Sequence, residues 1–519
     1  MNMQKNLNNL ASTNITGRSY PVLAVHKPTS TDDVQQLILQ SRQSKNPLYP
    51  ISCGLNWGYG SASPATPGCS LVDLSGMNRI LNAEKISISN PIAVVEAGVT
   101  QGQLYDFLQS HCPELTFNVT GSARGTSLIG NALDRGVGYF GPRKDDLFGL
   151  EVVCGSGQII KTGFRRLGEN SPLAHSHPFG LGPMLDGLFF QGNFGIVTSA
   201  CFRLMPRRPK EVAVSLALRD SSNLALFIDE LGHLKREGLM TSVTHIANKA
   251  RSQASMMFGM TSYLEEYCNF SSADALIEAE KALNVVAPNE WTSLGAITGN
   301  AGQVAAAIKE IKQRMKRIAR ISVITEGLLD FGYGVMHNFR FLSFARANAA
   351  AISAIRPLHA LALGVPTDVA IDNLLWKYNR IDLEATKLDQ SNCGLMFISP
   401  ALPPDGKIVV RLIEGMKKLA AQYDHILYMT VNIETATSFV AIINILFDRS
   451  RATEVDNAHR CSDALLNYIH AQGLEIYRAR ADLMDDITSR DPSYWNFVRS
   501  LKSTFDPDNI IAPGRYNIN

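Results

Sequence analysis

The chain has 519 residues, enough for two or three domains with a large buried core. Hydrophobic residues make up 45% of it and charged residues 18%, which argues against disorder and predicts a partly covered surface, as in a homodimer. The chain has 49 Lys and Arg and 47 Asp and Glu, so its formal net charge is only +2. Such a balance provides no field for nucleic acid or for a membrane surface, and both are excluded as expected partners.

Residues 1–13 are rich in Asn and lack the apolar core of a signal peptide. No stretch approaches the 18 or more apolar residues of a spanning helix, so we expect a cytoplasmic protein. The eight cysteines lie far apart without a CxxC pair. This spacing predicts reduced thiols, with neither a disulfide framework nor a metal site.

From Tyr20 to Arg207, short apolar runs alternate with helical stretches and glycine is frequent, which is an α+β pattern. The elements predicted here are, in chain order, a helix that Ser30 and Asp33 introduce, a strand at 47–51, a strand at 92–99, a helix that Thr100 and Gln103 introduce, and a β-hairpin over 150–162.

Beyond residues 206–209 the helices and strands become longer and glycine becomes rarer, so we place a domain boundary there. The elements predicted in this part are a strand at 212–218, a helix at 223–234, a strand at 395–399, a helix at 408–422, a strand at 425–433 and a buried strand at 439–447. They suggest β-α-β units whose sheet carries helices on one face. Residues 505–515 are predicted to be a loop because they contain proline and glycine.

Three glycine-rich segments fall in the first part of the chain, at 51–61, 120–139 and 191–198. Their backbone N–H groups suit an anion-binding nest, and the lack of side chains lets the backbone approach a large ligand closely. The first segment does not fit GxGxxG or the Walker pattern, which disfavours a nicotinamide Rossmann site or a P-loop. Three such segments in one domain are hard to explain as turns alone.

The most specific motifs are Asn56-Trp57-Gly58-Tyr59-Gly60-Ser61-Ala62, Val95-Glu96-Ala97-Gly98-Val99-Thr100, Gly130-Asn131-Ala132-Leu133-Asp134-Arg135-Gly136-Val137-Gly138-Tyr139 and Asp506-Pro507-Asp508-Asn509-Ile510-Ile511-Ala512-Pro513-Gly514-Arg515. In order and spacing they resemble the FAD-dependent vanillyl-alcohol oxidase and p-cresol methylhydroxylase (PCMH) family. The resemblance covers most of the chain, from about Pro21 to Asn517.

The resemblance implies an α+β protein with a two-subdomain PCMH-type FAD-binding domain and a ferredoxin-like α+β cap domain. The expected divisions are an N-terminal extension at 1–15, the FAD-binding domain at 16–207, the cap or substrate-binding domain at 208–476, and a C-terminal segment at 477–519 that returns to complete the flavin site. The residues implied to bind FAD are Ser52, Cys53, Gly54, Leu55, Asn56, Trp57, Gly58, Gly121, Ser127, Gly130, Asn131, Asp134, Gly138, Gly195, Ile196, Val197 and Arg478.

Members of this family oxidise para-substituted phenols: a hydride leaves the benzylic carbon for the flavin while the phenol is held as phenolate. The resemblance implies that Tyr59, Tyr477 and Arg515 hold the phenolate through charge-assisted hydrogen bonds. It places Arg478 near the pyrimidine edge of the flavin. A 4-alkylphenol or a 4-hydroxybenzyl alcohol is therefore the expected aromatic substrate.

The sequence departs from the family at the positions that tether FAD. The histidine position is Leu395 and the tyrosine position is Leu374, and neither side chain can form the bond. We therefore predict non-covalent FAD, although the nearby Tyr378 and Tyr428 leave an unusual link open.

A second departure concerns proton transfer. Asp145 or Asp146 is the candidate base near the flavin, with a solvated turn as the alternative. The family's histidine pair in the cap is replaced by Val440 and Ala441, and a glutamate position by Val431. The cap side of the pocket is therefore expected to be more apolar than in the family's reference enzymes.

Two other functions remain open from the sequence. The same flavin chemistry could act on a non-phenolic alcohol or a secondary metabolite, or the chain could be a flavin-fold binding protein without turnover. The electron acceptor, O2 or a cytochrome partner, is also open.

Overall fold

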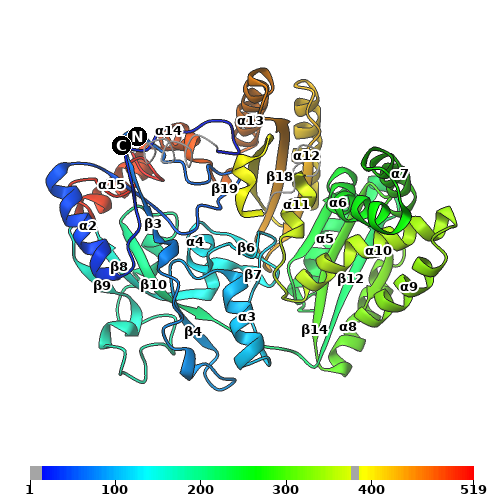
Figure 1. The fold of residues 1–519 in the computed structure, drawn as a ribbon, viewed down its shortest axis with the longest axis horizontal. Coiled ribbons are helices and arrows are strands. Elements are labelled where there is room, and N and C mark those ends of the chain that lie inside the picture. The colour runs from blue at the N-terminus through cyan, green and yellow to red at the C-terminus, as the bar shows by residue number, and fades with distance from the viewer. Residues whose placement is uncertain (1–13, 376–384, 519) are drawn as a thin grey trace.

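The protein, described here by a computed structural model, is defined for residues 14–375 and 385–518. Figure 1 shows two parts side by side, one formed by residues 14–206 together with the C-terminal segment, and the other built on one large sheet. Within these ranges, no helix is both long and apolar enough to cross a bilayer.

The first part contains a parallel three-stranded sheet next to helix α2 (Thr31–Ser44). The strands, in sheet order, are β1 (Val25–His26), β3 (Ser70–Asp73) and β2 (Leu48–Ile51). Val34 and Ile38 of α2 pack with Leu48 and Leu71 in a common core. Because the apolar side chains of α2 recur at a spacing of four, one face of the helix covers the sheet.

An antiparallel four-stranded sheet forms the other half of this part. Its strands, in sheet order, are β4 (Ile92–Glu96), β10 (Gly195–Arg203), β8 (Leu147–Cys154) and β9 (Ile159–Lys161). It shares a core with α3 (Gln101–His111) and α4 (Leu128–Leu133). The short pairs β5 (Leu115–Thr116) with β11 (Met205–Pro206) and β6 (Val137–Gly138) with β7 (Gly141–Pro142) complete it.

The predicted starts and turns of these elements are confirmed. Ser30 and Thr100 each accept a hydrogen bond from the backbone N–H three residues ahead, at the beginnings of α2 and α3. The predicted hairpin is β8 with β9, and Gly157 at its turn has a φ of +89°, a value that favours glycine.

The second part is built on an antiparallel sheet of eight strands. In sheet order these are β15 (Ala319–Ile324), β12 (Lys210–Leu218), β14 (Trp291–Gly299), β13 (Thr244–Asn248), β17 (Tyr428–Ile433), β18 (Phe439–Asp448), β16 (Cys393–Leu402) and β19 (Ile476–Arg478). The strands predicted at 212–218, 395–399, 425–433 and 439–447 are confirmed. The last predicted division, between residues 476 and 477, falls inside β19.

Helices cover both faces of this sheet, whereas the sequence predicted helices on one face. The helices that share the large core with the sheet are α5 (Leu224–Arg236), α8 (Ala301–Met315), α12 (Gly406–Ala421) and α13 (Ala452–Ala471). The helices predicted at 223–234 and 408–422 are therefore confirmed as α5 and α12.

A second group of helices has a small core of its own and includes α6 (Lys249–Cys268), α7 (Ser272–Val286) and α10 (Ser343–Ala362), with α9 (Glu326–Asn338) and α11 (Val369–Leu375) beside them. Since α6 and α10 line a cavity together with the strands, this group lies over the opposite face of the sheet. The sequence pattern of the individual strands did not reveal that helices cover this second face.

The C-terminal segment returns to the first part of the chain. Two helices that the sequence did not predict, α14 (Met484–Arg490) and α15 (Pro492–Phe505), precede the loop that it did predict. In this loop Ile511 forms a parallel bridge with Leu48 of β2. The buried Lys502 pairs with Asp506 at 2.6 Å and donates to the backbone carbonyl of Ile511. The tail therefore lies beside β2, which leads into the first glycine-rich segment.

Candidate active site

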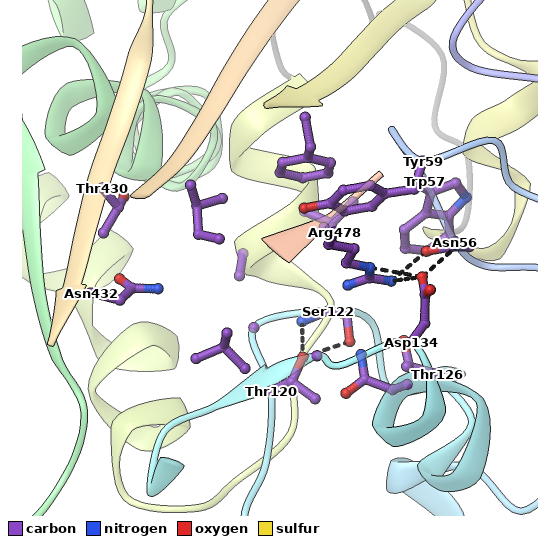
Figure 2. Close-up of a pocket in the computed structure, with 18 of the residues that line it drawn as sticks. Asn56, Trp57, Tyr59, Thr120, Ser122, Thr126, Asp134, Thr430, Asn432 and Arg478 are labelled. Atoms are coloured by element: carbon purple, nitrogen blue, oxygen red, sulfur yellow. Dashed lines mark hydrogen bonds and ion pairs between the residues drawn. The ribbon is translucent and has the colours of Figure 1, made fainter. Parts of the chain in front are cut away.

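A cavity of about 680 Å³ lies where the two parts of the molecule meet. All three glycine-rich segments, the C-terminal segment and the face of the large sheet toward α6 and α10 contribute to its wall. The cavity is thus assembled from stretches separated by hundreds of residues, and it has the size of a ligand-binding site. Figure 2 shows Tyr59, Trp57 and Arg478 on one side of it and Thr430 and Asn432 on the other.

Most residues that the resemblance implied for FAD line this cavity. They are Ser52, Cys53, Gly54, Leu55, Asn56, Trp57, Gly121, Ser127, Gly130, Asn131, Asp134, Gly195, Ile196, Val197 and Arg478. Gly58 and Gly138 do not line it. A Cβ on Gly58 would meet the ring of Phe397, and a Cβ on Gly138 would meet the side chain of Asn118, so both glycines allow close packing inside the protein.

Several buried polar atoms in this wall have no hydrogen-bond partner within the described protein. They are Trp57 Nε1, Thr126 Oγ1, Asn131 Oδ1 and Arg515 Nη1. Buried polar groups are rarely left without a partner, so these atoms fit a ligand with many donors and acceptors. Gly130 allows Ser52, another residue of the wall, to pack closely, because a Cβ there would lie 2.7 Å from Ser52 Oγ. FAD, with its phosphates, hydroxyls and ring carbonyls, fits this donor set.

Asp134 connects the two arginines of the site. Its carboxylate pairs with Arg478 at 2.7 Å and Arg515 at 3.1 Å, and it accepts a hydrogen bond from Asn56 at 3.0 Å. Burial opposes ionisation of Asp134, but the two guanidinium groups outweigh it and hold its pKa below the ordinary value. Two cations against one anion leave this end of the cavity positively charged.

Tyr59 and Tyr477 lie next to this pair of arginines. The guanidinium carbon of Arg478 lies 4.1 Å from the ring centre of Tyr59, whose other face stacks on Phe397 at 5.0 Å. The Tyr59 hydroxyl shares a hydrogen bond of 2.7 Å with Ser399 Oγ. Burial raises the pKa of both tyrosines, so both keep their protons at neutral pH and can act as donors.

Of the four residues implied for substrate and flavin chemistry, the structure brings Tyr59, Tyr477 and Arg478 into direct proximity. Arg515 is joined to them through Asp134, and its guanidinium carbon lies 4.6 Å from the ring centre of Tyr516. Sequence analysis did not identify Phe397 or Ser399 as parts of the site. Both lie on β16, and no local pattern marks a strand residue that faces a loop 340 residues away.

Asp145 does not line the cavity. It is exposed and pairs with Lys144 at 2.7 Å, as in the alternative of a solvated turn. Asp146, in contrast, is buried, accepts a hydrogen bond from Asn118 at 2.8 Å and has a pKa raised by burial to about 6. The fully buried Arg143 lies 5.1 Å from the ring centre of Phe202. In this segment, Lys144 and Asp145 therefore face solvent, whereas Arg143 and Asp146 are buried inside the protein.

The positions implied for a covalent flavin link have different surroundings. Leu395 is buried in a small apolar core, and Tyr428 packs against the same core without lining the cavity. Tyr378 and the side chain of Leu374 lie outside the described residues. Within residues 14–375 and 385–518, no group of three His, Cys, Asp or Glu side chains could hold a metal ion.

The cap side of the cavity carries polar as well as apolar side chains, and the expectation that it is more apolar than in the family's reference enzymes stays a prediction. Of the three positions behind this expectation, Ala441 packs in the large core. Val431 also faces this core, because side chains alternate along a strand. Its neighbours Thr430 and Asn432 line the cavity instead. The alternation of polar and apolar residues in β17 was the signal that could have revealed them.

Comparisons with known proteins agree with this architecture. Residues 22–163 match the protein family described as an FAD binding domain. The chain is 29% identical to 1'-carboxy-chondrochloren decarboxylase of Chondromyces crocatus, over 98% of this chain and 92% of that protein. It is 26% identical to the flavoprotein subunit of 4-cresol dehydrogenase [hydroxylating] of Pseudomonas putida, over 95% and 89%.

A solved structure of p-cresol methylhydroxylase with substrate bound matches the fold with a TM-score of 0.77 at 25% identity, covering 95% of this chain and 88% of that chain. The similarity to these proteins therefore extends over both parts of the molecule, beyond the segment that matches the FAD binding domain.

Proposed function

We propose that this chain, which belongs to the PCMH-type FAD-linked oxidases, oxidises a para-substituted phenol, such as a 4-alkylphenol or a 4-hydroxybenzyl alcohol, at its benzylic carbon. The chain is an FAD-dependent oxidoreductase. One relative acts, by its name, on 4-cresol, which is a para-substituted phenol. FAD, when bound, supplies the acceptor for the hydride that leaves the substrate.

The observation that carries this proposal is a pair of tyrosines beside a guanidinium, the buried Tyr59 and the partly buried Tyr477. Burial raises the pKa of Tyr59 and Tyr477, so each remains a neutral hydrogen-bond donor. Arg478 stays charged, because the carboxylate of Asp134 outweighs the effect of burial and raises its pKa. Two donors and one cation favour a phenolate over a phenol.

The chain's own residues then act by binding and by orientation. The stack of Tyr59 on Phe397 fixes the direction of its hydroxyl, and the contact with Arg478 holds the opposite face of the ring. A substrate oxygen bound by Tyr59 and Tyr477 keeps its negative charge. A phenolate donates electrons through its ring to the benzylic carbon, which makes loss of a hydride easier.

The test is anaerobic mixing of the FAD-loaded protein with 4-cresol, 4-ethylphenol and 4-hydroxybenzyl alcohol, with absorbance at the flavin bands as the readout. We expect bleaching by at least one phenol and none by its 4-methoxy analogue, which cannot form a phenolate. Bleaching by the methoxy compound at the same rate would favour a non-phenolic alcohol as the substrate. Stoichiometric FAD with no bleaching by any phenol would refute the proposal.

FAD is proposed to be non-covalently bound, because leucines stand where the family's tethers are expected. Acid precipitation of the purified protein should leave a colourless pellet and a yellow supernatant. A yellow pellet would show a covalent link and overturn this part of the proposal.

A further inference from the structure

The cavity continues from the tyrosines across the face of the large sheet that looks toward α6 and α10. Adjacent strands place residues of this face opposite one another: His245 pairs with Asn432, and Ala247 pairs with Thr430. Ser215 and Ala217 of β12 extend the same face. In Figure 2, Asn432 and Thr430 lie across the cavity from Tyr59 and Arg478. A substituent on the far side of a bound phenol would therefore reach a polar surface.

Among the described residues of this surface, Arg251 and the exposed Arg320 are the charged groups, and Arg251 lacks an anion. It lies in the first turn of α6 and lines the cavity. Its guanidinium forms no hydrogen bond or ion pair with residues 14–375 or 385–518, and Nη1 is fully buried without a partner. By comparison, Arg478 and Arg515 at the other end share Asp134. A partly buried cation without a counter-ion is unfavourable, and its place in the cavity wall points to an anionic ligand.

The neighbours of Arg251 are neutral. Burial lowers the pKa of His245 to about 4, so this imidazole carries no charge near pH 7. Burial raises the pKa of Tyr139 to about 12, and the nearby charge of Arg251 only partly opposes this effect. Among the described residues that line the cavity, Asp134 is the one carboxylate. Nothing described in the wall therefore neutralises Arg251.

The single charge of Arg251 narrows the kind of anion, and the tautomer of His245 places a hydrogen-bond acceptor near it. Its Nδ1 lies 2.9 Å from Asn432 Oδ1, an acceptor, so Nδ1 carries the hydrogen and donates. Nε2 then carries a lone pair, and this buried atom has no partner in the described protein. A phosphate has a charge of about −1.5 to −2, which exceeds the charge of the single guanidinium. A carboxylate matches the charge and planar geometry of one guanidinium.

We propose that Arg251 is a specificity-determining residue that binds a carboxylate on the substituent of the substrate, opposite the end that binds the phenol. This inference rests on the function proposed above and names the substrate class more closely: a para-substituted phenol whose substituent ends in a carboxylate. His245 Nε2 would accept a hydrogen bond from a hydroxyl or a water molecule beside it.

The experiment measures dissociation constants of the FAD-loaded protein by isothermal titration calorimetry. The probes are 4-hydroxyphenylalkanoates with two to six carbons in the chain, their methyl esters, and phenylalkanoates without the hydroxyl. We expect at least one acid to bind the wild type about 10- to 100-fold more tightly than its ester, which corresponds to one charge-assisted hydrogen-bonded contact. Arg251→Gln should abolish this ratio, and Arg251→Lys should retain part of it.

Two variants serve as controls. Arg317→Gln removes an equal charge at an exposed position away from the cavity, and it should keep the wild-type ratio. Arg320 also lines the cavity but lies exposed on the edge strand β15. If Arg320→Gln lost the ratio and Arg251→Gln kept it, the assignment to Arg251 would be wrong.

The outcomes separate this inference from the proposed function. Bleaching by 4-ethylphenol without any preference for acids over esters would overturn the inference and leave the function intact. Absence of bleaching, with phenylalkanoates still bound through Arg251, would support the carboxylate contact of Arg251 and refute the phenol as the substrate class. Loss of FAD from Arg251→Gln would show that the guanidinium serves the cofactor, which would also overturn the inference. An equal loss of acid and ester affinity would overturn it as well, because it would indicate a structural role alone.

Discussion

Replacement of Asp134 by asparagine tests the electrostatic arrangement on which the candidate site depends. The carboxylate of Asp134 is 15% exposed and the side chains of Arg478 and Arg515 are each 11% exposed. The asparagine side chain would keep the shape of the aspartate and remove the negative charge that both guanidinium groups share. Breaking a buried ion pair from one side costs about 3–5 kcal/mol, so we expect a loss of that size in the free energy of unfolding at pH 7.

The assay is urea unfolding of the FAD-loaded proteins at one fixed FAD concentration, followed by circular dichroism and flavin fluorescence. Asp145→Asn is the matched control, because Asp145 forms an exposed pair with Lys144 and its loss should cost about 0–1 kcal/mol. The pKa of Asp134 is lowered in the folded protein, so its contribution is complete above the ordinary aspartate pKa. The advantage of the wild type over D134N should shrink as the pH falls through the lowered pKa.

A double variant distinguishes charge from packing. In D134N, the guanidinium groups of Arg478 and Arg515 both lack a counter-ion. Adding Arg515→Met leaves only that of Arg478 uncompensated, so the double variant should be more stable than D134N. The reasoning fails if D134N is as stable as D145N, or if the double variant loses more than the sum of its single changes.

Three further predictions follow from the same geometry. Tyr59→Phe keeps the ring contacts but removes a donor from the phenolate, and should slow flavin reduction by a phenol about 100-fold in stopped-flow absorbance. Because it also removes the hydrogen bond with the buried Ser399 Oγ, it should lower the free energy of unfolding by about 1–3 kcal/mol in urea denaturation. Burial raises the pKa of Glu434 to about 7, against the nearby charge of Lys144, so the folded wild type loses stability as the pH rises from about 4.5 to 7. The free energy of unfolding of Glu434→Gln should therefore gain up to about 3 kcal/mol relative to that of the wild type between pH 4 and pH 8. Identical pH profiles of the two proteins in urea unfolding would contradict this. Gly130→Ala places a Cβ 2.7 Å from Ser52 Oγ and should weaken FAD binding in fluorescence titrations, whereas Gly187→Ala, where a Cβ meets nothing within 4 Å, should bind FAD as the wild type does.

The described structure also explains why removal of Arg251 should not harm the fold. No described carboxylate pairs with this partly buried guanidinium, so Arg251→Gln should unfold at the same temperature as the wild type or a higher one when no substrate is present. A clear decrease in the melting temperature would mean that Arg251 supports the cap structure.

Much of the local structure was predictable because it depends on neighbours in the sequence. The helix starts at Ser30 and Thr100 follow from a side chain that bonds the N–H three residues ahead, and Gly157 permits the hairpin turn. These interactions span a few residues, so their signals are complete within short windows. The sequence motifs also indicated FAD and the family, since the residues of each motif lie close together in the chain.

Other features depended on the pairing of distant strands and on the return of the tail. Whether Thr430 or Val431 faces the cavity is decided by which face of β17 the helices α12 and α5 cover. The contact of Ser399 with Tyr59, the joining of Arg478 and Arg515 through Asp134, and the missing partner of Arg251 arise only after folding. The sequence by itself determined which side chains were available for chemistry. The tertiary structure decided which of them became neutralised and which kept an unmatched charge, because Coulomb interactions and burial depend on distance in space and not on separation along the chain.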